Sequence, residues 1–182
     1  MVLKEITVSK KNPYYQEICG IMKASFPDTE LLPMWMLRLM AQRKYAEFIG
    51  LLDGDALCGI LFTAENEKYV FVLYLAVSEK IRSKGYGSQL LDFVKEKANG
   101  REIILHAEYP DETKDNATQR SRRMDFYAKN GIVNTGYWFG EGAEKYIVLS
   151  TDGRDADMKS YKDLLRYLSF GLYAPEIKRI NA

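Results

Sequence analysis

The most informative stretch of the sequence is Leu75-Ala76-Val77-Ser78-Glu79-Lys80-Ile81-Arg82-Ser83-Lys84-Gly85-Tyr86-Gly87-Ser88. It begins as an apolar run that ends at Val77, and a short basic turn with two glycines follows. The turn leads directly into a helical pattern whose apolar residues share one face. Those residues are Leu90, Leu91, Val94 and Ala98. The stretch therefore predicts a buried strand, a tight turn and a helix in immediate succession.

The predicted turn has the features of an anion-binding site. The first backbone N–H groups of a helix have no partner within the helix and carry a partial positive charge. Because Gly85 and Gly87 have no side chains, a phosphate can approach the main chain closely. Arg82 and Lys84 add positive charge. We therefore predict that the turn binds a pyrophosphate, and a glycine turn with only a structural role is the alternative.

Other motifs that bind phosphates or carry nucleophiles do not match. The dinucleotide fingerprint G-x-G-x-x-G requires a third glycine where this chain has Leu90. A Walker loop, G-x-x-x-x-G-K-[ST], and a G-x-S-x-G nucleophile elbow are both absent from the sequence. These three classes are therefore excluded.

The hydrophobic pattern on either side of this stretch predicts an α/β fold. The 69–77 run is apolar on both faces, which is typical of a central strand covered by helices. The order of elements indicates a mixed sheet. Strands are expected at residues 3–8, 46–52, 56–63, 69–77, 102–108, 132–139 and 145–150, and helices near 13–26, 31–44, 87–98, 118–129 and 155–170.

Length and composition limit the class of protein. A chain of 182 residues has the length of one domain, at roughly 100–200 residues per domain. The 26 Lys and Arg side chains nearly balance the 25 Asp and Glu side chains, which leaves a net charge of +1. A general nucleic-acid binder normally carries a basic surplus, so no nucleic-acid partner is expected. Two cysteines and one histidine are too few for a disulfide framework or a Cys/His zinc site, so no metal is expected.

The sequence also lacks the signals of secretion and membrane insertion. Residues 1–6 contain no basic region followed by a long apolar core. The longest apolar run, residues 70–77, is far shorter than the ~20 residues that span a bilayer. We therefore expect a cytoplasmic protein with no membrane partner.

Two segments resemble signatures of the GNAT superfamily of acetyl-CoA-dependent N-acetyltransferases. Arg82-Ser83-Lys84-Gly85-Tyr86-Gly87 matches R/Q-x-x-G-x-G/A. Phe126-Tyr127-Ala128-Lys129-Asn130-Gly131-Ile132 resembles F-Y-x-x-x-G-F, with Ile132 in place of the final aromatic residue. The resemblance covers about residues 3–150. It implies a mixed, mostly antiparallel central sheet flanked by helices, in which the strands 69–77 and 102–108 part from each other.

The resemblance also implies a domain organisation. Residues 1–150 would form the acetyl-CoA-binding N-acetyltransferase domain. Residues 151–182 lie outside the resemblance and form a helical C-terminal extension. We expect this extension to pack on its own domain, and a homodimer contact is the alternative.

The same resemblance assigns the binding of acetyl-CoA, the cosubstrate, mainly to the main chain. Backbone N–H groups from Ser83 to Ser88 would hold the pyrophosphate, with Arg82 supporting the turn. Main-chain groups of Leu75 and Val77 would meet the pantetheine arm. The implied cofactor-binding residues are Leu75, Ala76, Val77, Arg82, Ser83, Lys84, Gly85, Tyr86, Gly87 and Ser88.

Catalytic roles are implied for two residues. Tyr127 matches the family's general acid, which would protonate the departing thiolate. One branch of the family has a glutamate midway along the central strand, but this chain has Phe71 there. Glu108 is therefore our candidate for the general base or an amine anchor, directly or through water. His106 and ordered water alone are the alternatives.

Two further groups of residues have open interpretations. Arg120, Arg122 and Arg123 form either a solvated face or a contact with CoA phosphates. In the family, the first two helices and the last hairpin usually recognise the acceptor. The side chains of those segments would line an aromatic acceptor pocket or pack in the core. They are Phe26, Met34, Trp35, Met36, Tyr137, Trp138 and Phe139.

The resemblance therefore implies transfer of an acetyl group from acetyl-CoA to a primary amine of a small molecule or a peptide. Direct attack in a ternary complex is expected, because neither motif contains a cysteine to carry the acyl group. A non-catalytic CoA-binding regulatory or interaction module is the alternative, since Phe71 cannot accept a proton. Transfer of a longer acyl group is a third interpretation.

Overall fold

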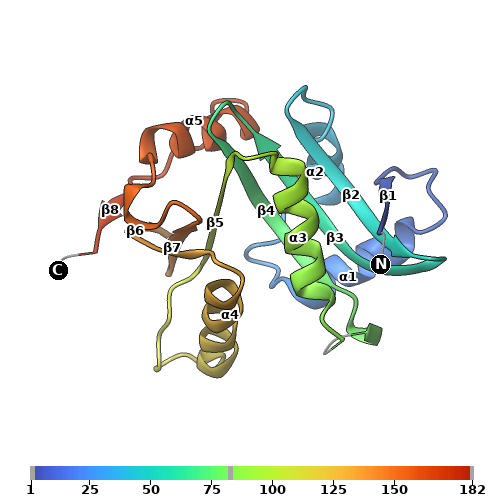
Figure 1. Ribbon diagram of the computed structural model, residues 1–182, viewed down its shortest axis with the longest axis horizontal. Helices are drawn as coiled ribbons and strands as arrows, with labels where there is room; N and C mark the ends of the chain where they lie inside the picture. Colours follow the sequence, from blue (N-terminus) through green and yellow to red (C-terminus); the bar gives the residue numbers. More distant parts are fainter. Residues whose placement is uncertain (1–2, 82–83, 181–182) are drawn as a thin grey trace. The chain divides into compact units, whose positions relative to one another are not determined.

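The computed structural model describes residues 3–81 and 84–180 (Figure 1). Its strands form one mixed sheet in the order β1-β2-β3-β4-β5-β7-β6-β8. Strands β4 and β5 are parallel, and the pairs β1–β2, β2–β3, β5–β7, β6–β7 and β6–β8 are antiparallel. This arrangement confirms the predicted α/β class with a mostly antiparallel sheet. The strands are β1 (Lys4–Thr7), β2 (Ala46–Asp53), β3 (Ala56–Glu65), β4 (Tyr69–Val77), β5 (Glu102–Glu108), β6 (Val133–Glu141), β7 (Glu144–Ser150) and β8 (Lys178–Arg179).

The helices follow the predicted order, with two differences in length. The helix expected over residues 31–44 is only seven residues long, because the chain after Met40 closes into tight turns. The C-terminal helix begins at Met158, where the Asp157 side chain accepts from the amides of Lys159 and Ser160. The helices are α1 (Tyr15–Ser25), α2 (Met34–Met40), α3 (Tyr86–Ala98), α4 (Ala117–Lys129) and α5 (Met158–Leu168), with short 3-10 turns η1 (Glu79–Ile81) and η2 (Gly153–Asp155).

Two compact units share the chain. Unit 1 contains Met1–Glu65 and Val72–Asn99, and unit 2 contains Asn66–Phe71 and Gly100–Ala182. Strand β4 therefore begins in unit 2 and continues in unit 1. No helix in the described part of the chain is both long and apolar enough to cross a bilayer.

In unit 1, α1 and α3 both pack on β3, which pairs with β2. The predicted apolar face of α3 is confirmed, because all four of its residues are buried. In α1, Ile18, Ile21 and Met22 are buried in the same way. Burial of one apolar stripe per helix is what fixes both helices on the sheet.

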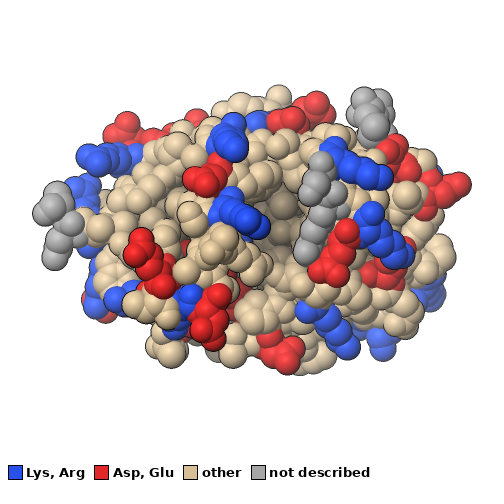
Figure 2. Space-filling view, turned by 90° about the horizontal axis from the view of Figure 1, so that it is seen from below, with Lys and Arg blue, Asp and Glu red and all other residues tan. Residues whose placement is uncertain are grey.

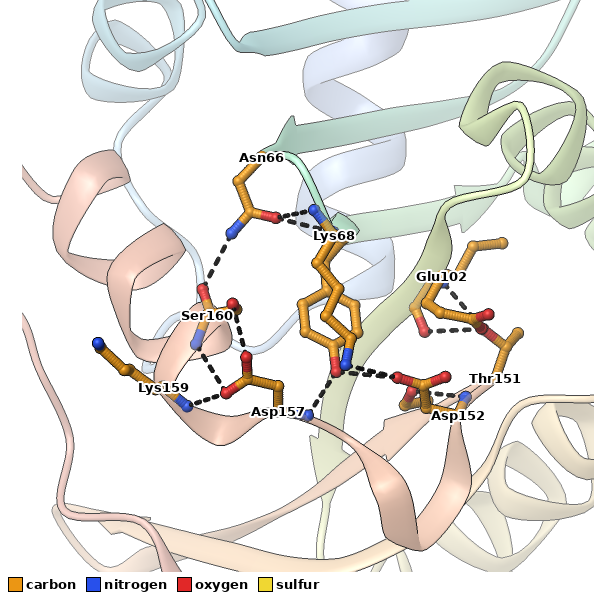
Figure 3. Close-up of polar contacts among 11 residues, drawn as sticks. Asn66, Lys68, Glu102, Thr151, Asp152, Asp157, Lys159 and Ser160 are labelled. Carbon is orange, nitrogen blue, oxygen red and sulfur yellow. Dashed lines mark hydrogen bonds and ion pairs between the residues drawn. The ribbon is translucent and has the colours of Figure 1, made fainter.

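In unit 2, a polar network fixes the C-terminal segment to the start of β4 (Figure 3). The Tyr69 hydroxyl donates to Asp152 Oδ2 at 3.1 Å and accepts from the Asp157 amide at 2.6 Å. Asn66 Nδ2 donates to the Ser160 carbonyl at 3.1 Å. The buried face of α5 adds apolar packing. Its residues are Tyr161, Leu164, Leu165 and Leu168.

Candidate functional site

The strand-turn-helix stretch of unit 1 has the predicted local structure. Strand β4 ends at Val77, and α3 begins at Tyr86 directly after Gly85, which has a left-handed backbone with φ of 80°. Lys84 and Gly85 are exposed. Arg82 and Ser83, which the resemblance includes in the cofactor site, lie outside the described residues. The structure thus places the amides of the first α3 turn immediately after an exposed turn.

The first turn of α3 is chemically suited to an anion. Among the described residues, no side chain caps its amides, and the turn contains no acidic residue. A Cβ added at Gly85 would meet no atom of the described residues within 4 Å. Uncapped amides at a helix N-terminus bind phosphate groups. The residues present therefore fit the diphosphate of a CoA molecule.

A glycine in β3 brings α3 close to the sheet. A Cβ at Gly59 would lie 2.4 Å from the Ala76 carbonyl oxygen and 2.7 Å from Leu90 Cδ2. Only glycine leaves room for this approach, so Gly59 sets the position of the helix that follows the turn. Sequence reasoning missed this residue, although a glycine inside an apolar strand is a signal of close backbone approach.

A second contact missed from the sequence holds the N-terminus of α3. The Tyr86 hydroxyl donates to Asp53 Oδ2 at 2.7 Å, from the end of β2. This hydrogen bond raises the pKa of Tyr86 to about 12. Tyr86 therefore ties the first residue of α3 to the β2–β3 hairpin, within unit 1.

The Leu75, Ala76 and Val77 segment closes β4 in unit 1. Ala76 is buried, whereas Leu75 and Val77 are half-buried. The backbone N–H of the next residue, Ser78, donates to the Cys58 carbonyl at 2.8 Å and so joins the end of β4 to β3.

Tyr127, the predicted general acid, lies in α4 of unit 2. Its ring is buried and stands 5.3 Å from the Phe126 ring. Burial raises the pKa of Tyr127, and Arg123 opposes part of that rise. The phenol is therefore protonated at neutral pH, which is the state that a general acid requires.

Glu108, the candidate base, is buried at the end of β5 in a network of charges. Its Oε2 accepts from Arg123 Nη1 at 2.6 Å. Its Oε1 accepts from Asn116 Nδ2 at 3.0 Å and lies 3.1 Å from Arg120 Nη2. Two guanidinium groups and the Asn116 amide thus lie against its two oxygens. The geometry therefore favours a structural role over proton abstraction.

Arg120 is the centre of the same network and not part of a solvated face. It is only 4% exposed. Its other contacts are Nε to Asn116 Oδ1 at 2.7 Å, Nη1 to the Tyr109 carbonyl at 3.1 Å and Nη2 to Glu144 Oε2 at 2.9 Å. Because protein acceptors surround the guanidinium, neither interpretation from the sequence holds for Arg120. Arg122 is exposed and Arg123 is half-buried.

The side chains proposed for an acceptor pocket separate into core and surface. Phe139 is fully buried, whereas Trp35 is 59% exposed. In unit 1, the Tyr74 hydroxyl donates to the Glu30 carbonyl at 2.6 Å and accepts from the Leu32 amide at 3.1 Å. Phe26 packs edge-on against the Tyr74 ring at 4.7 Å. The loop between α1 and α2 is therefore fixed by a residue of the central strand.

Figure 2 shows Lys and Arg side chains interspersed with Asp and Glu side chains over the face in view. Among the residues with a described placement, no group of three or more His, Cys, Asp or Glu side chains could hold a metal ion.

A comparison with protein-family models finds a match to this chain. Residues 44–131 match the family model of the GNAT acetyltransferase domain, a range that includes β4, the turn, α3 and Tyr127. This segment of the chain is a GNAT acetyltransferase domain. No curated protein sequence matches it.

Solved structures share this GNAT fold. A GNAT-family protein from Bacteroides thetaiotaomicron is 21% identical, with a TM-score of 0.74 over 95% of this chain and 100% of that one. A GNAT acetyltransferase from Elizabethkingia anophelis with acetyl-CoA bound is 14% identical, with a TM-score of 0.56 over 81% of this chain and 96% of that one. The aminoglycoside 6'-N-acetyltransferase from Enterococcus faecium is 15% identical, with a TM-score of 0.59 over 82% of this chain and 96% of that one. At these identities the likeness establishes the fold.

Proposed function

We propose that this GNAT protein transfers the acetyl group of acetyl-CoA directly to a primary amine of a small molecule or a peptide. The observation that carries the proposal is the first turn of α3, which no side chain in the described part of the chain caps and which follows an exposed glycine in a left-handed conformation. This turn stands at the position of the GNAT signature, and a relative of the same fold was solved with acetyl-CoA bound.

In the proposed mechanism, the main chain of unit 1 binds the cosubstrate. Amides from Lys84 to Ser88 donate to the diphosphate, and the positive end of α3 stabilises its charge. Gly59 and Tyr86 act on this site indirectly, because they fix where α3 begins. When bound, acetyl-CoA supplies the activated acetyl group.

Tyr127 is the proposed proton donor. Acetyl transfer to an amine releases a thiolate, and a positioned acid that protonates it typically accelerates such a step by about 10²–10⁴. The raised pKa keeps the Tyr127 phenol protonated over the neutral range.

The amine must lose its proton before it attacks, since a free lysine-like amine titrates near ~10.4. Phe71 is apolar and fully buried, and both Glu108 oxygens accept hydrogen bonds from the network around Arg120. We therefore assign the removal of this proton to ordered water and not to Glu108.

The test combines calorimetry with a turnover assay on the full chain. CoA and acetyl-CoA should bind saturably, and free thiol should form when acetyl-CoA is mixed with a panel of polyamines, aminoglycosides, amino acids and N-terminal peptides. Saturable binding without thiol release for any amine would favour a non-catalytic CoA-binding module. Absence of binding would remove the proposal altogether.

A further inference from the structure

His106, the one histidine of the chain, has one polar partner among the described residues and lies in an aromatic environment. Its ring lies 5.2 Å from the Phe139 ring, 5.5 Å from Tyr146 and 5.6 Å from Phe71. Its Nδ1 lies 2.6 Å from the hydroxyl of Tyr161, which α5 contributes. All five residues belong to unit 2, and the four neighbouring side chains hold the His106 ring in one orientation.

Both members of the pair are neutral at pH 7. Burial lowers the pKa of His106 from 6.5 to about 4, so the imidazole carries one ring proton. Burial raises the pKa of Tyr161 well above 10.0, and Tyr173 and Glu141 add to this rise, so the hydroxyl keeps its proton. In the tautomer in which this hydroxyl donates to Nδ1, the ring proton of the imidazole is on Nε2.

The titratable groups near the His106–Tyr161 pair do not oppose these protonation states. Tyr146 of β7 faces His106, and Glu141 of β6 acts on Tyr161 together with Tyr173, whose hydroxyl donates to Glu141 at 2.9 Å. Phe71 and Phe139 carry no charge. No cation faces the imidazole among the described residues that contact it.

In this tautomer, the Nε2–H group is available for a ligand. No residue in the described ranges accepts a hydrogen bond from Nε2, and the His106 residue is partly exposed despite the surrounding rings. With Nδ1 accepting from Tyr161 and the proton on Nε2, neither nitrogen is free to act as a base. In this tautomer His106 is a neutral donor.

We infer that Tyr161 positions His106 so that Nε2–H donates to an oxygen of the acceptor substrate. This inference rests on the proposed acetyl transfer and names the acceptor class: an amine whose remaining part is apolar or aromatic and carries a hydrogen-bond-accepting oxygen. A neutral N–H among aromatic rings selects an oxygen acceptor and disfavours a second ammonium group, which has no lone pair to accept with. Phe71, at the position of the family's glutamate, removes the carboxylate that a second cation would need.

The tautomer can be measured directly, because only one histidine contributes to the spectrum. Nitrogen-15 NMR of the full chain should show Nε2–H and an acceptor Nδ1, with no titration between about pH 5.5 and 8. In Tyr161→Phe, the Nδ1 signal should lose its hydrogen-bond shift. An Nδ1–H tautomer, or a titration near the ordinary value, would overturn the assignment.

Ligand binding supplies the second test. Phenylalaninamide has a carbonyl oxygen that phenethylamine lacks, so only the former should shift the Nε2–H resonance. If neither amine nor any carbonyl-bearing member of the panel shifts it, the inference fails even if turnover is found. If turnover is absent but the shift occurs, the proposed enzyme activity fails and the donor site remains.

A matched pair of variants separates donation from packing. His106→Gln keeps an N–H donor, whereas His106→Leu removes it. For an oxygen-bearing acceptor, His106→Leu should raise KM by at least about tenfold, and His106→Gln should remain within about threefold. The Kd for CoA should be unchanged in both. An equal KM in His106→Leu and the wild type would refute the role.

Discussion

At the scale of single residues, the partners of the two buried candidate catalytic side chains distinguish their roles. Burial raises the pKa of Tyr127, and no described residue forms a hydrogen bond with its hydroxyl. Glu108 instead pairs with the guanidinium groups of Arg120 and Arg123. Tyr127 is therefore suited to proton donation, and Glu108 to a structural ion pair.

We expect Tyr127→Phe to lower kcat at least tenfold, by about 1.4 kcal/mol or more in the barrier, with little effect on CoA affinity. The substitution removes only the hydroxyl, which no described residue binds by a hydrogen bond. Steady-state kinetics and calorimetry measure the two quantities. Unchanged turnover would show that Tyr127 does not act as an acid.

Glu108→Gln should destabilise the protein by roughly 2–5 kcal/mol, because it removes a charge that compensates buried Arg120. Urea denaturation measures the change. Glu144→Gln is the matched control, since Glu144 contacts the same guanidinium but is more exposed, and it should cost less. A stable Glu108→Gln variant with a lower kcat and an altered pH profile would instead support a catalytic role.

The lowered pKa of His106 predicts a specific pH dependence of stability. The unfolded chain binds a proton at this residue below its ordinary pKa of 6.5, whereas the folded chain binds it only near pH 4. Stability should therefore fall as the pH decreases from 6.5 to 4, by up to about 3 kcal/mol from this residue. The difference in unfolding free energy between the wild type and His106→Gln isolates this contribution. A difference that does not vary with pH would contradict it.

At the scale of elements, the position of α3 depends on its distance from β3. Gly59→Ala would force a Cβ against the Ala76 carbonyl and Leu90, so α3 or the strand must move. We expect a loss of stability of about 1–3 kcal/mol and weaker CoA binding. Thermal unfolding and calorimetry measure both.

Gly20→Ala is the control for this substitution. A Cβ at Gly20 in α1 meets no atom within 4 Å, and alanine is the better helix former by about 1 kcal/mol. It should therefore stabilise the protein and leave CoA binding unchanged. Equal CoA affinity in Gly59→Ala and the wild type would show that the approach of α3 does not set the binding turn.

At the scale of the whole molecule, the C-terminal segment completes unit 2. The family match ends at residue 131, yet α5 buries four apolar residues and Tyr69 bonds to both ends of the connection before it. Deletion of residues 151–182 should therefore abolish cooperative unfolding of unit 2, as measured by calorimetry and near-UV circular dichroism. Deletion of residues 175–182 is the control and should keep the transition, because β8 is short and exposed. A cooperative transition in the chain that lacks residues 151–182 would show that unit 2 folds without the C-terminal segment.

Local patterns in the sequence were sufficient to predict the main helices and strands. The strands 69–77 and 102–108 and the buried face of α3 were predicted with the observed bounds, because burial on two faces or on one stripe leaves a periodic apolar pattern. The glycines and the basic turn before α3 likewise indicate an anion site from chain-local chemistry. Strand β8 has only two exposed residues, and such a strand leaves no pattern to detect.

Only the tertiary structure decided which polar side chains meet. Tyr86 bonds to Asp53, 33 residues away, and Tyr161 to His106, 55 residues away. Periodicity reports whether a side chain faces the core, but the partner of a buried polar group depends on which strands and helices the topology brings together. The sequence therefore determined the fold and predicted the anion-binding turn, whereas the ion pairs of Glu108 and the contact of His106 with Tyr161 depend on the folded chain.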